Sequence, residues 1–275
     1  MAHKIQKRFG LRSAHLVRKK RRNKILVRVL TGFFTVALVV FFLSWLSFRQ
    51  IFTVSDIIST GNAAISSDEI AAVAKTELSG SYLHLFSKAN IFLYPKRKIE
   101  DDLLSSFKRF EQVSGGLEDL SVMHIKVVER QAVALWCTSV GDADCYFIDE
   151  TGFVFAAATG TLDNLLRFEG LISESKPVGK NYLPSADFNK LNVFAKAFIN
   201  LGAPIVDISA NEEEGDFEAY VRNGGKILFN AKDFSKTLEN ANAILSESTI
   251  NDKDFWERLN YLDLRFDNKV FYKLK

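Results

Sequence analysis

Acidic residues are absent from the first 28 positions of this 275-residue chain, and charged residues of either sign are absent from the next twenty. The uncharged run begins at Val29 and ends at Phe48. At about 1.5 Å per residue, twenty helical residues cover the roughly 30 Å hydrocarbon core of a bilayer. A core helix of a soluble protein would carry a polar face, whereas this run has only two threonines and two serines. We therefore predict a transmembrane helix over residues 29–48. It lacks the ionisable residues that mark transport or catalysis inside a membrane.

The charge balance reverses across this run. Eleven of the 36 Lys and Arg residues lie within residues 1–28, which leaves 25 basic residues against 33 acidic ones in the remainder. Basic flanks stay in the cytoplasm, so the pattern predicts a cytoplasmic tail over residues 1–28 and a single-pass protein with residues 49–275 outside. A cleavable signal peptide would have a shorter apolar run and a small-residue cleavage site, which we do not find. A basic tail can bind nucleic acid, but beside a membrane helix we expect it to contact anionic lipid headgroups instead.

Cysteine is scarce: Cys137 and Cys145 are the only two, and both fall on the predicted outer side. The seven residues between them suit the loop of a β-hairpin. In an oxidising compartment the two cysteines could form a disulfide across that hairpin. The alternative is a pair of reduced, small apolar side chains, and the sequence leaves both open.

Residues 49–130 predict a first outer module. A strand is expected over residues 52–61, and Ser66 and Glu69 have the spacing of a capping box at the start of a helix. Pro95 opens a second helix with an apolar stripe, and Ser114-Gly115-Gly116 would end this helix or form the turn just past it. The stripe is Ile99, Leu103, Phe107 and Phe110. A short strand over residues 110–113 and a long one over residues 120–128 complete a β-α-α-β-β module.

Residues 131–275 predict a second, β-rich domain. Short strands are expected over residues 133–136, 145–148 and 153–155, with helices over residues 187–201 and 233–245. Asn223-Gly224 between alternating apolar residues is a strong hairpin signal. The chain ends in two alternating runs around Asp267 and Asn268. The fold class is therefore α+β, after a single N-terminal transmembrane helix.

Five features in the same order resemble the FtsQ/DivIB family of bacterial division proteins. They are the tail–helix–domain layout, VSDIISTGN at 54–62 with the SSDEI helix start at 66–70, VVERQAVALW at 127–136, IDETGFVF at 148–155 and YLDLRF at 261–266. The resemblance implies a POTRA domain over residues 49–130 and a partner-binding β-domain over residues 131–275. It also implies a place in the bacterial inner membrane at the division septum. Ala132 stands where family members often have Pro, and Phe266 where Tyr is common.

Residues that could carry chemistry are few. The two outer histidines, His84 and His124, have no Cys or His at metal-ligand spacing. No nucleophile motif of the G-x-S-x-G or S-x-x-K kind has supporting context. We interpret the acidic residues from Glu212 to Asp216 as a solvated turn. The sequence therefore predicts no catalytic residue, no metal and no cofactor. An anchored cell-wall hydrolase would need an acid–base pair or a metal cluster that we cannot assemble.

A binding role is the better prediction, and the segment from Tyr261 to Tyr272 is its main candidate. A strand near a terminus is often a sheet edge with unpaired N–H and C=O groups. The predicted partner-binding residues are Tyr261, Leu264, Arg265, Phe266 and Asn268. Alternation would put Leu262, Leu264 and Phe266 on one face, and Arg265 on the other could fork to a partner carboxylate. Alternatively, the protein's own chain covers this edge.

The resemblance implies that the partners are bitopic division proteins of the FtsB/FtsL type and the septal wall-synthesis complex. Membrane lipid is a further expected contact, whereas nucleic acid and small-molecule substrates are not expected. The function implied is a membrane-anchored, non-enzymatic scaffold of the division machinery. The alternative is a POTRA-bearing subunit of a polypeptide secretion or outer-membrane assembly system.

Overall fold

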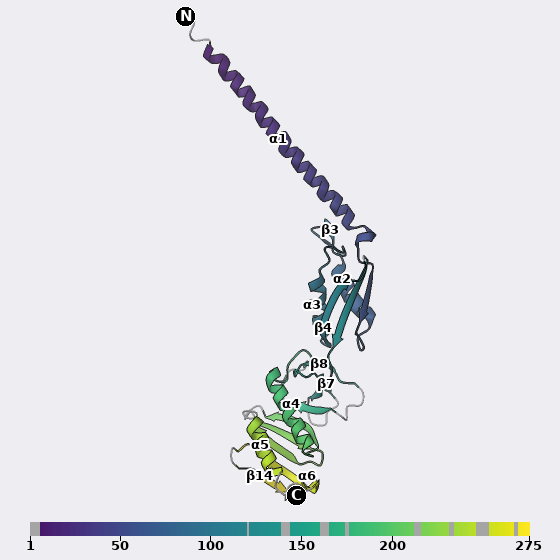
Figure 1. The fold of residues 1–275 in the computed structure, drawn as a ribbon, viewed down its shortest axis with the longest axis vertical. Coiled ribbons are helices and arrows are strands. Elements are labelled where there is room, and N and C mark those ends of the chain that lie inside the picture. The colour runs from purple at the N-terminus through teal and green to yellow at the C-terminus, as the bar shows by residue number, and fades with distance from the viewer. Residues whose placement is uncertain are drawn as a thin grey trace. The chain divides into compact units, whose positions relative to one another are not determined.

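The computed structural model describes residues 6–119, 121–138, 144–159, 165–173, 176–211, 216–230, 234–245, 253–266 and 269–275. The chain divides into two compact units (Figure 1). The first unit comprises Met1–Leu103 and Val113–Val127, and the second comprises Leu104–Gln112 and Val128–Lys275. Helices and a large sheet confirm the α+β class. The predicted domain limits of 49–130 and 131–275 stay predictions.

Helix α1 (Gln6–Ser47) opens the first unit and continues from the basic tail through the apolar run without a break (Figure 1). Within the described part of the chain, its segment Arg21–Ser47 is the one helix long and apolar enough to cross a membrane. Its apolar side chains are exposed, as in Phe33 and Phe41, because no other described element packs along most of its length. The helix ends one residue before the predicted limit, at Ser47.

A three-stranded sheet and two helices form the rest of the first unit. The sheet has the order β1-β5-β4, and β1 runs parallel to β5. The elements are the 3-10 turn η1 (Gln50–Phe52), β1 (Asp56–Thr60), α2 (Ser67–Leu78), β2 (Ser81–Tyr82), β3 (Phe86–Ser87), α3 (Lys96–Ser106), β4 (Phe110–Leu117) and β5 (Val122–Glu129). The predicted capping box is present, because Ser66 and Glu69 each accept from the other's backbone N–H. Helix α3 starts directly after Pro95, as predicted.

Three details of the first module differ from the prediction. The Gly115-Gly116 pair neither ends a helix nor forms a turn after it, but lies inside strand β4, which also contains Phe110. A Cβ atom on Gly115 would lie 2.9 Å from Cε of Met123, so this glycine makes room for a buried methionine on β5. The β2–β3 hairpin between the two helices was not predicted, and β1 is shorter than residues 52–61.

The second unit is built on a nine-stranded sheet of order β14-β13-β12-β11-β10-β9-β6-β7-β8. The strands are β6 (Ala134–Cys137), β7 (Cys145–Ile148), β8 (Val154–Ala157), β9 (Leu166–Glu169), β10 (Ile205–Asn211), β11 (Asp216–Val221), β12 (Lys226–Asn230), β13 (Leu259–Asp263) and β14 (Phe271–Leu274). The pairs β6–β9, β9–β10 and β12–β13 are parallel, and the other pairs are antiparallel. The predicted hairpin at Asn223-Gly224 is confirmed.

The described helices of the second unit contribute to its core together with the strands: α4 (Ser185–Asn200), α5 (Phe234–Leu245) and α6 (Lys253–Arg258). Their apolar side chains form one buried cluster with the sheet, and α4 and α5 lie together over it in Figure 1. Phe194 of α4 packs with tilted rings against Phe229 of β12 and Phe234 of α5, with ring centroids 4.6 and 5.6 Å apart. Helix α4 begins two residues before the predicted Asp187, and α6 was not predicted.

Candidate partner-binding surface

Strand β14 lies at one end of the nine-stranded sheet. It pairs with β13 on one side, and no described residue pairs with its other side. The cross-strand register aligns Leu228 of β12, Asp263 of β13 and Phe271 of β14 in one row. All four residues of β14 are partly or fully exposed, so this edge carries accessible backbone groups and accessible side chains.

Arg265 follows β13 and is engaged by the chain's own carboxylates. Its Nε and Nη2 atoms donate to the two carboxylate oxygens of Asp263 at 2.9 and 2.8 Å, and its Nη1 donates to Asp216 at 3.0 Å. The hydrogen bonds to Asp263, and then those to Asp216, raise the pKa of Arg265 above its ordinary value. This forked geometry ties the residues after β13 to the start of β11. The Arg265 guanidinium therefore has a structural role within the second unit, because these two carboxylates already bind it.

The predicted partner-binding residues differ in how exposed they are in the structure. Leu264 is 2% exposed and belongs to the core, together with Leu262. Tyr261 is half-buried, whereas Phe266 is 48% exposed. Leu262 and Leu264 are both buried in the core, whereas Phe266 does not share their face, because β13 ends at Asp263 and the alternation ends with it. Asn268 and Asp267 lie outside the described residues, as do residues 212–215 of the acidic segment.

Two aromatic residues that we did not single out from the sequence complete this surface. Phe271 and Tyr272 of β14 are each 48% exposed. The rings of Phe266 and Phe271 meet edge to face, with centroids 5.2 Å apart, although both remain accessible. Exposed aromatic side chains often dominate the energy of protein interfaces. The alternation of apolar and polar residues near the end of the sequence predicted strands there, but it did not show which strand would form the edge of the sheet.

Two of the sequence motifs meet at Asp149. This carboxylate accepts hydrogen bonds from the backbone N–H groups of Thr151 and Phe153, from the Thr151 hydroxyl and from Arg130. The Arg130 guanidinium lies 4.5 Å from the centre of the Phe153 ring and also donates to the carbonyl of Lys108. Asp149 is 4% exposed. Because its oxygens are fully used in shaping the β7–β8 turn, we interpret the ERQ and DETG motifs as structural.

A second buried group of charges lies on β9 and β10. Arg167 forks to both carboxylate oxygens of Asp207. Glu169 is 6% exposed, and its Oε1 atom has no hydrogen-bond partner in the described part of the chain. Burial, and then the nearby charge of Asp207, raise the pKa of Glu169 above its ordinary 4.5. Burial and a hydrogen bond to Glu218 likewise raise the pKa of Tyr220 on β11 to about 12.

The remaining candidates from the sequence are dispersed. His124 on β5 lies 3.3 Å from the Thr60 hydroxyl, and His84 lies at the tip of the β2–β3 hairpin. The described residues contain no group of three or more His, Cys, Asp or Glu side chains able to hold a metal ion. Cys137 and Cys145 lie opposite each other on β6 and β7 and are joined by a disulfide in the structure.

In the residues that the structure describes, the chain has one helix able to cross a membrane and two compact units, and the second unit has an accessible sheet edge at β14. No family model and no curated protein matches the chain. Among solved structures, it is similar to the major extracytoplasmic domain of the trans isomer of the bacterial cell division protein DivIB from Geobacillus stearothermophilus. The two are 13% identical with a TM-score of 0.28, over 46% of this chain and 98% of that one.

Proposed function

We propose that this protein is a membrane-anchored, non-enzymatic scaffold of the bacterial division machinery. Its α1 helix would span the inner membrane once, with the basic tail in the cytoplasm. Its outer units would bind bitopic division proteins of the FtsB/FtsL type and link early ring components to the septal wall-synthesis complex. The five ordered sequence features and the charge asymmetry around the apolar run support this proposal.

The observation that carries the binding role is the open edge of β14. A partner segment in extended conformation can pair with an exposed strand edge through main-chain hydrogen bonds. Side chains beside that edge then select the partner. Here the accessible side chains are the aromatic pair Phe266 and Phe271, with Tyr272 next to them. We therefore place the partner against β14 rather than against β13, which β14 covers.

The sequence suggests Arg265 as a partner contact, but substituting it is a poor test of partner binding. Replacing it by Glu would put a third carboxylate beside Asp263 and Asp216, both of which now share the guanidinium. Loss of binding in such a variant would report local repulsion as much as a lost partner contact. Phe266 and Phe271 are better probes, because truncating an exposed ring leaves the buried cluster intact.

The test measures the affinity of the detergent-solubilised full chain for the extracytoplasmic segment of an FtsB-type partner. We expect Phe271→Ala, and separately Phe266→Ala, to weaken binding about 30-fold, which corresponds to a hot spot of roughly 2 kcal/mol. Ile199→Ala is the matched control, because Ile199 is an apolar residue of the same unit that is 43% exposed on α4. Wild-type affinity in both Phe variants, with unchanged circular dichroism, would contradict the proposed surface.

A cellular experiment tests the wider role. A fluorescent fusion should gather at mid-cell, and depletion should give filaments with assembled but unconstricted rings. Loss of outer-membrane proteins on depletion would instead support a secretion or assembly subunit. Complete septa with failed cell separation would support a wall hydrolase.

A further inference from the structure

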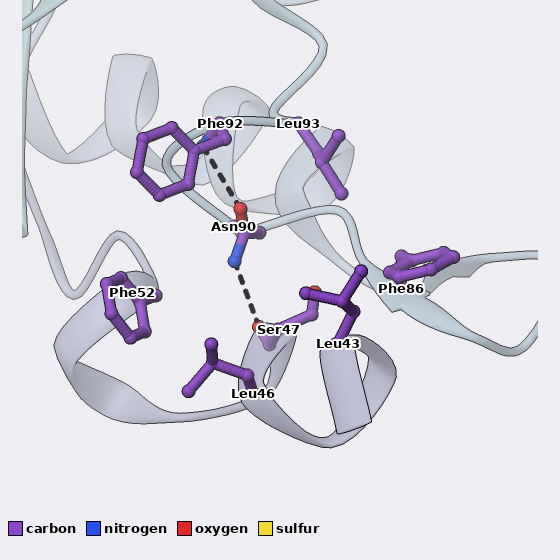
Figure 2. Close-up of a pocket in the computed structure, with 8 residues that line it drawn as sticks. All are labelled: Leu43, Leu46, Ser47, Phe52, Phe86, Asn90, Phe92 and Leu93. Carbon is purple, nitrogen blue, oxygen red and sulfur yellow. Dashed lines mark hydrogen bonds between the residues drawn. The ribbon is translucent and has the colours of Figure 1, made fainter. Parts of the chain in front are cut away.

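The end of helix α1 is fastened to the loop between α2 and α3. The Ser44 hydroxyl donates to the Leu85 carbonyl, and the backbone N–H of Ser87 donates to the Ser47 hydroxyl at 3.0 Å. Asn90 Nδ2 donates to the Ser47 carbonyl at 3.3 Å, as Figure 2 shows. Ser47 is 5% exposed although it ends the apolar helix. The β2–β3 hairpin and the following loop are therefore held at a defined height on α1.

That height lies inside the apolar run. Ser44 is about one helical turn, roughly 6 Å, before Phe48, where the run ends. The run has only twenty residues, so nearly all of it is needed to cross a hydrocarbon core. A loop bonded to Ser44 therefore lies beside a part of the helix that faces lipid or the lipid interface.

The loop presents apolar side chains to its surroundings at this height. Leu83 at the hairpin tip is 87% exposed, and Phe92 is 77% exposed. Neighbouring exposed side chains of the same kind are Trp45, Phe48, Ile51, Tyr82, Leu85 and Leu93. Residues 80–94 contain no Asp or Glu, and Lys88 is their one Lys or Arg. Exposed apolar side chains gathered in this way mark an interaction surface, and aromatic and basic residues suit the headgroup level.

The backbone of the loop is also suited to an environment poor in water. Every N–H group from residue 87 to residue 94 donates to a partner within the chain. Asn90 is central, because its Oδ1 accepts from the N–H of Phe92 while its Nδ2 binds Ser47. Where little water is present, backbone polar groups must be satisfied within the protein, and this loop meets that need for these N–H groups.

Two further features of this loop suit contact with lipid. Leu83 and His84 have positive φ angles of 51° and 60°, a conformation that β-carbon sterics disfavour and that places Leu83 at the exposed tip. A cavity of about 270 Å³ lies between α1 and the loop, lined mostly by apolar side chains (Figure 2). Its walls are Leu43, Leu46, Ser47, Phe52, Phe86, Asn90, Phe92 and Leu93. A hydrocarbon chain fits such a lining better than water does.

We propose that residues 81–93 insert into the lipid interface of the outer leaflet, with Leu83 and Phe92 as the inserted side chains and an acyl chain filling the cavity. The first unit would then be held against the membrane surface at two points, the helix and this loop. The inference rests on the proposed membrane anchoring by α1, and it adds a lipid-binding surface to it.

The test uses the full chain in vesicles of phosphatidylethanolamine and phosphatidylglycerol, with one nitroxide label per variant. Cys137 and Cys145 are bridged, so a new cysteine is the single labelling site. Labels at Leu83→Cys and Phe92→Cys should collide more with oxygen and less with a water-soluble nickel chelate than the label at Ile58→Cys. Ile58 is the matched control, an apolar residue of the same unit that is 49% exposed on β1.

A label at Phe41→Cys, within the apolar run, separates failure of the loop from failure of the anchor. Lipid-like collisions at 41 with water-like collisions at 83 and 92 would overturn the loop inference and leave the membrane-anchored scaffold standing. Water-like collisions at 41 as well would overturn both.

A second variant tests the hairpin tip without endangering the fold. Asn adopts positive φ more readily than Leu, so Leu83→Asn should leave folding intact or improve it. A tip residue needed only for folding would therefore tolerate it. We expect Leu83→Asn to make the label at position 92 more accessible to the nickel chelate, and an unchanged accessibility would contradict the role of the tip.

Discussion

Truncating Asp149 tests how much of the second unit's stability rests on the contact between the ERQ and DETG motifs. Asp149→Ala removes the acceptor of two backbone N–H groups and one hydroxyl, and it leaves the Arg130 guanidinium without a carboxylate. The Arg130 side chain is 19% exposed, and it keeps its contacts with the Phe153 ring and the Lys108 carbonyl. These remaining contacts reduce the cost of the unpaired charge.

The expected loss follows from these contacts. Breaking a buried ion pair on one side costs about 3–5 kcal/mol, and partial exposure of Arg130 favours the lower end, about 3 kcal/mol. In a domain of this size, 1 kcal/mol shifts Tm by about 2–4 °C, so the second unit should melt roughly 6–12 °C lower. Near-UV circular dichroism of the solubilised full chain, recorded while heating, would measure the shift.

The control lies in the same turn. Glu150→Ala removes the same formal charge one residue away. Because Glu150 is exposed, this change should alter the free energy of unfolding of the second unit by no more than about 0.5 kcal/mol. Adding Arg130→Ala to Asp149→Ala should recover part of the loss, because no unpaired guanidinium then remains. Equal Tm shifts for Asp149→Ala and Glu150→Ala would refute this reasoning.

Three further predictions concern the second unit. Because burial raises the pKa of Glu169 above 4.5, the stability it contributes is complete below about pH 4.5 and is lost as pH rises through the raised pKa. Glu169→Gln should therefore raise Tm at about pH 8, with a gain that fades toward pH 4.5. Gly225→Ala should cost roughly 1–3 kcal/mol, because its Cβ would lie 2.5 Å from a backbone carbonyl oxygen of β13. Reducing the bridge between Cys137 and Cys145, which are eight residues apart, should cost about 2–3 kcal/mol, measured by thermal melting with and without reductant.

Each of these three has its own check. A Tm gain for Glu169→Gln that is constant from about pH 4.5 to 8 would show that the charge is not its source. Gly116→Ala is the control for Gly225, because a Cβ atom added at Gly116 would have no heavy atom within 4 Å, and the change should be neutral or slightly stabilising. Two free thiols found by mass spectrometry in protein extracted without reductant would refute the bridge.

Elements with strong local signals could be predicted from the sequence. The Ser66–Glu69 box, Pro95 and the Asn223-Gly224 turn each specify backbone geometry within a few residues, and the structure has them where predicted. Elements defined by distant packing could not. Phe107 and Phe110 continue the helical spacing of α3, so the sequence placed Phe110 both on that stripe and in a short strand over residues 110–113. In the structure Phe110 is buried at the start of β4, a choice that tertiary packing makes and local spacing does not.

The candidate surface shows the same division. Alternation identified the final run as strand-forming, yet it could not show that β13 would be covered and that β14 would be the edge. Nor could it show that Arg265 would find Asp216, a residue 49 positions away. Sheet order and long-range ion pairs depend on which segments meet in space, and a single sequence records that only indirectly.

The order of strands in the nine-stranded sheet has a consequence for synthesis. Strands β6, β7 and β8 form a meander, β9 joins the free side of β6, and each strand from β10 to β14 then adds beside its predecessor. The sheet therefore grows at one side as the polypeptide lengthens, and its newest strand is always the open one. A chain released before β14 would expose β13, with its neighbouring apolar residues, to other chains. Loss of β14 should therefore make the second unit more prone to aggregate.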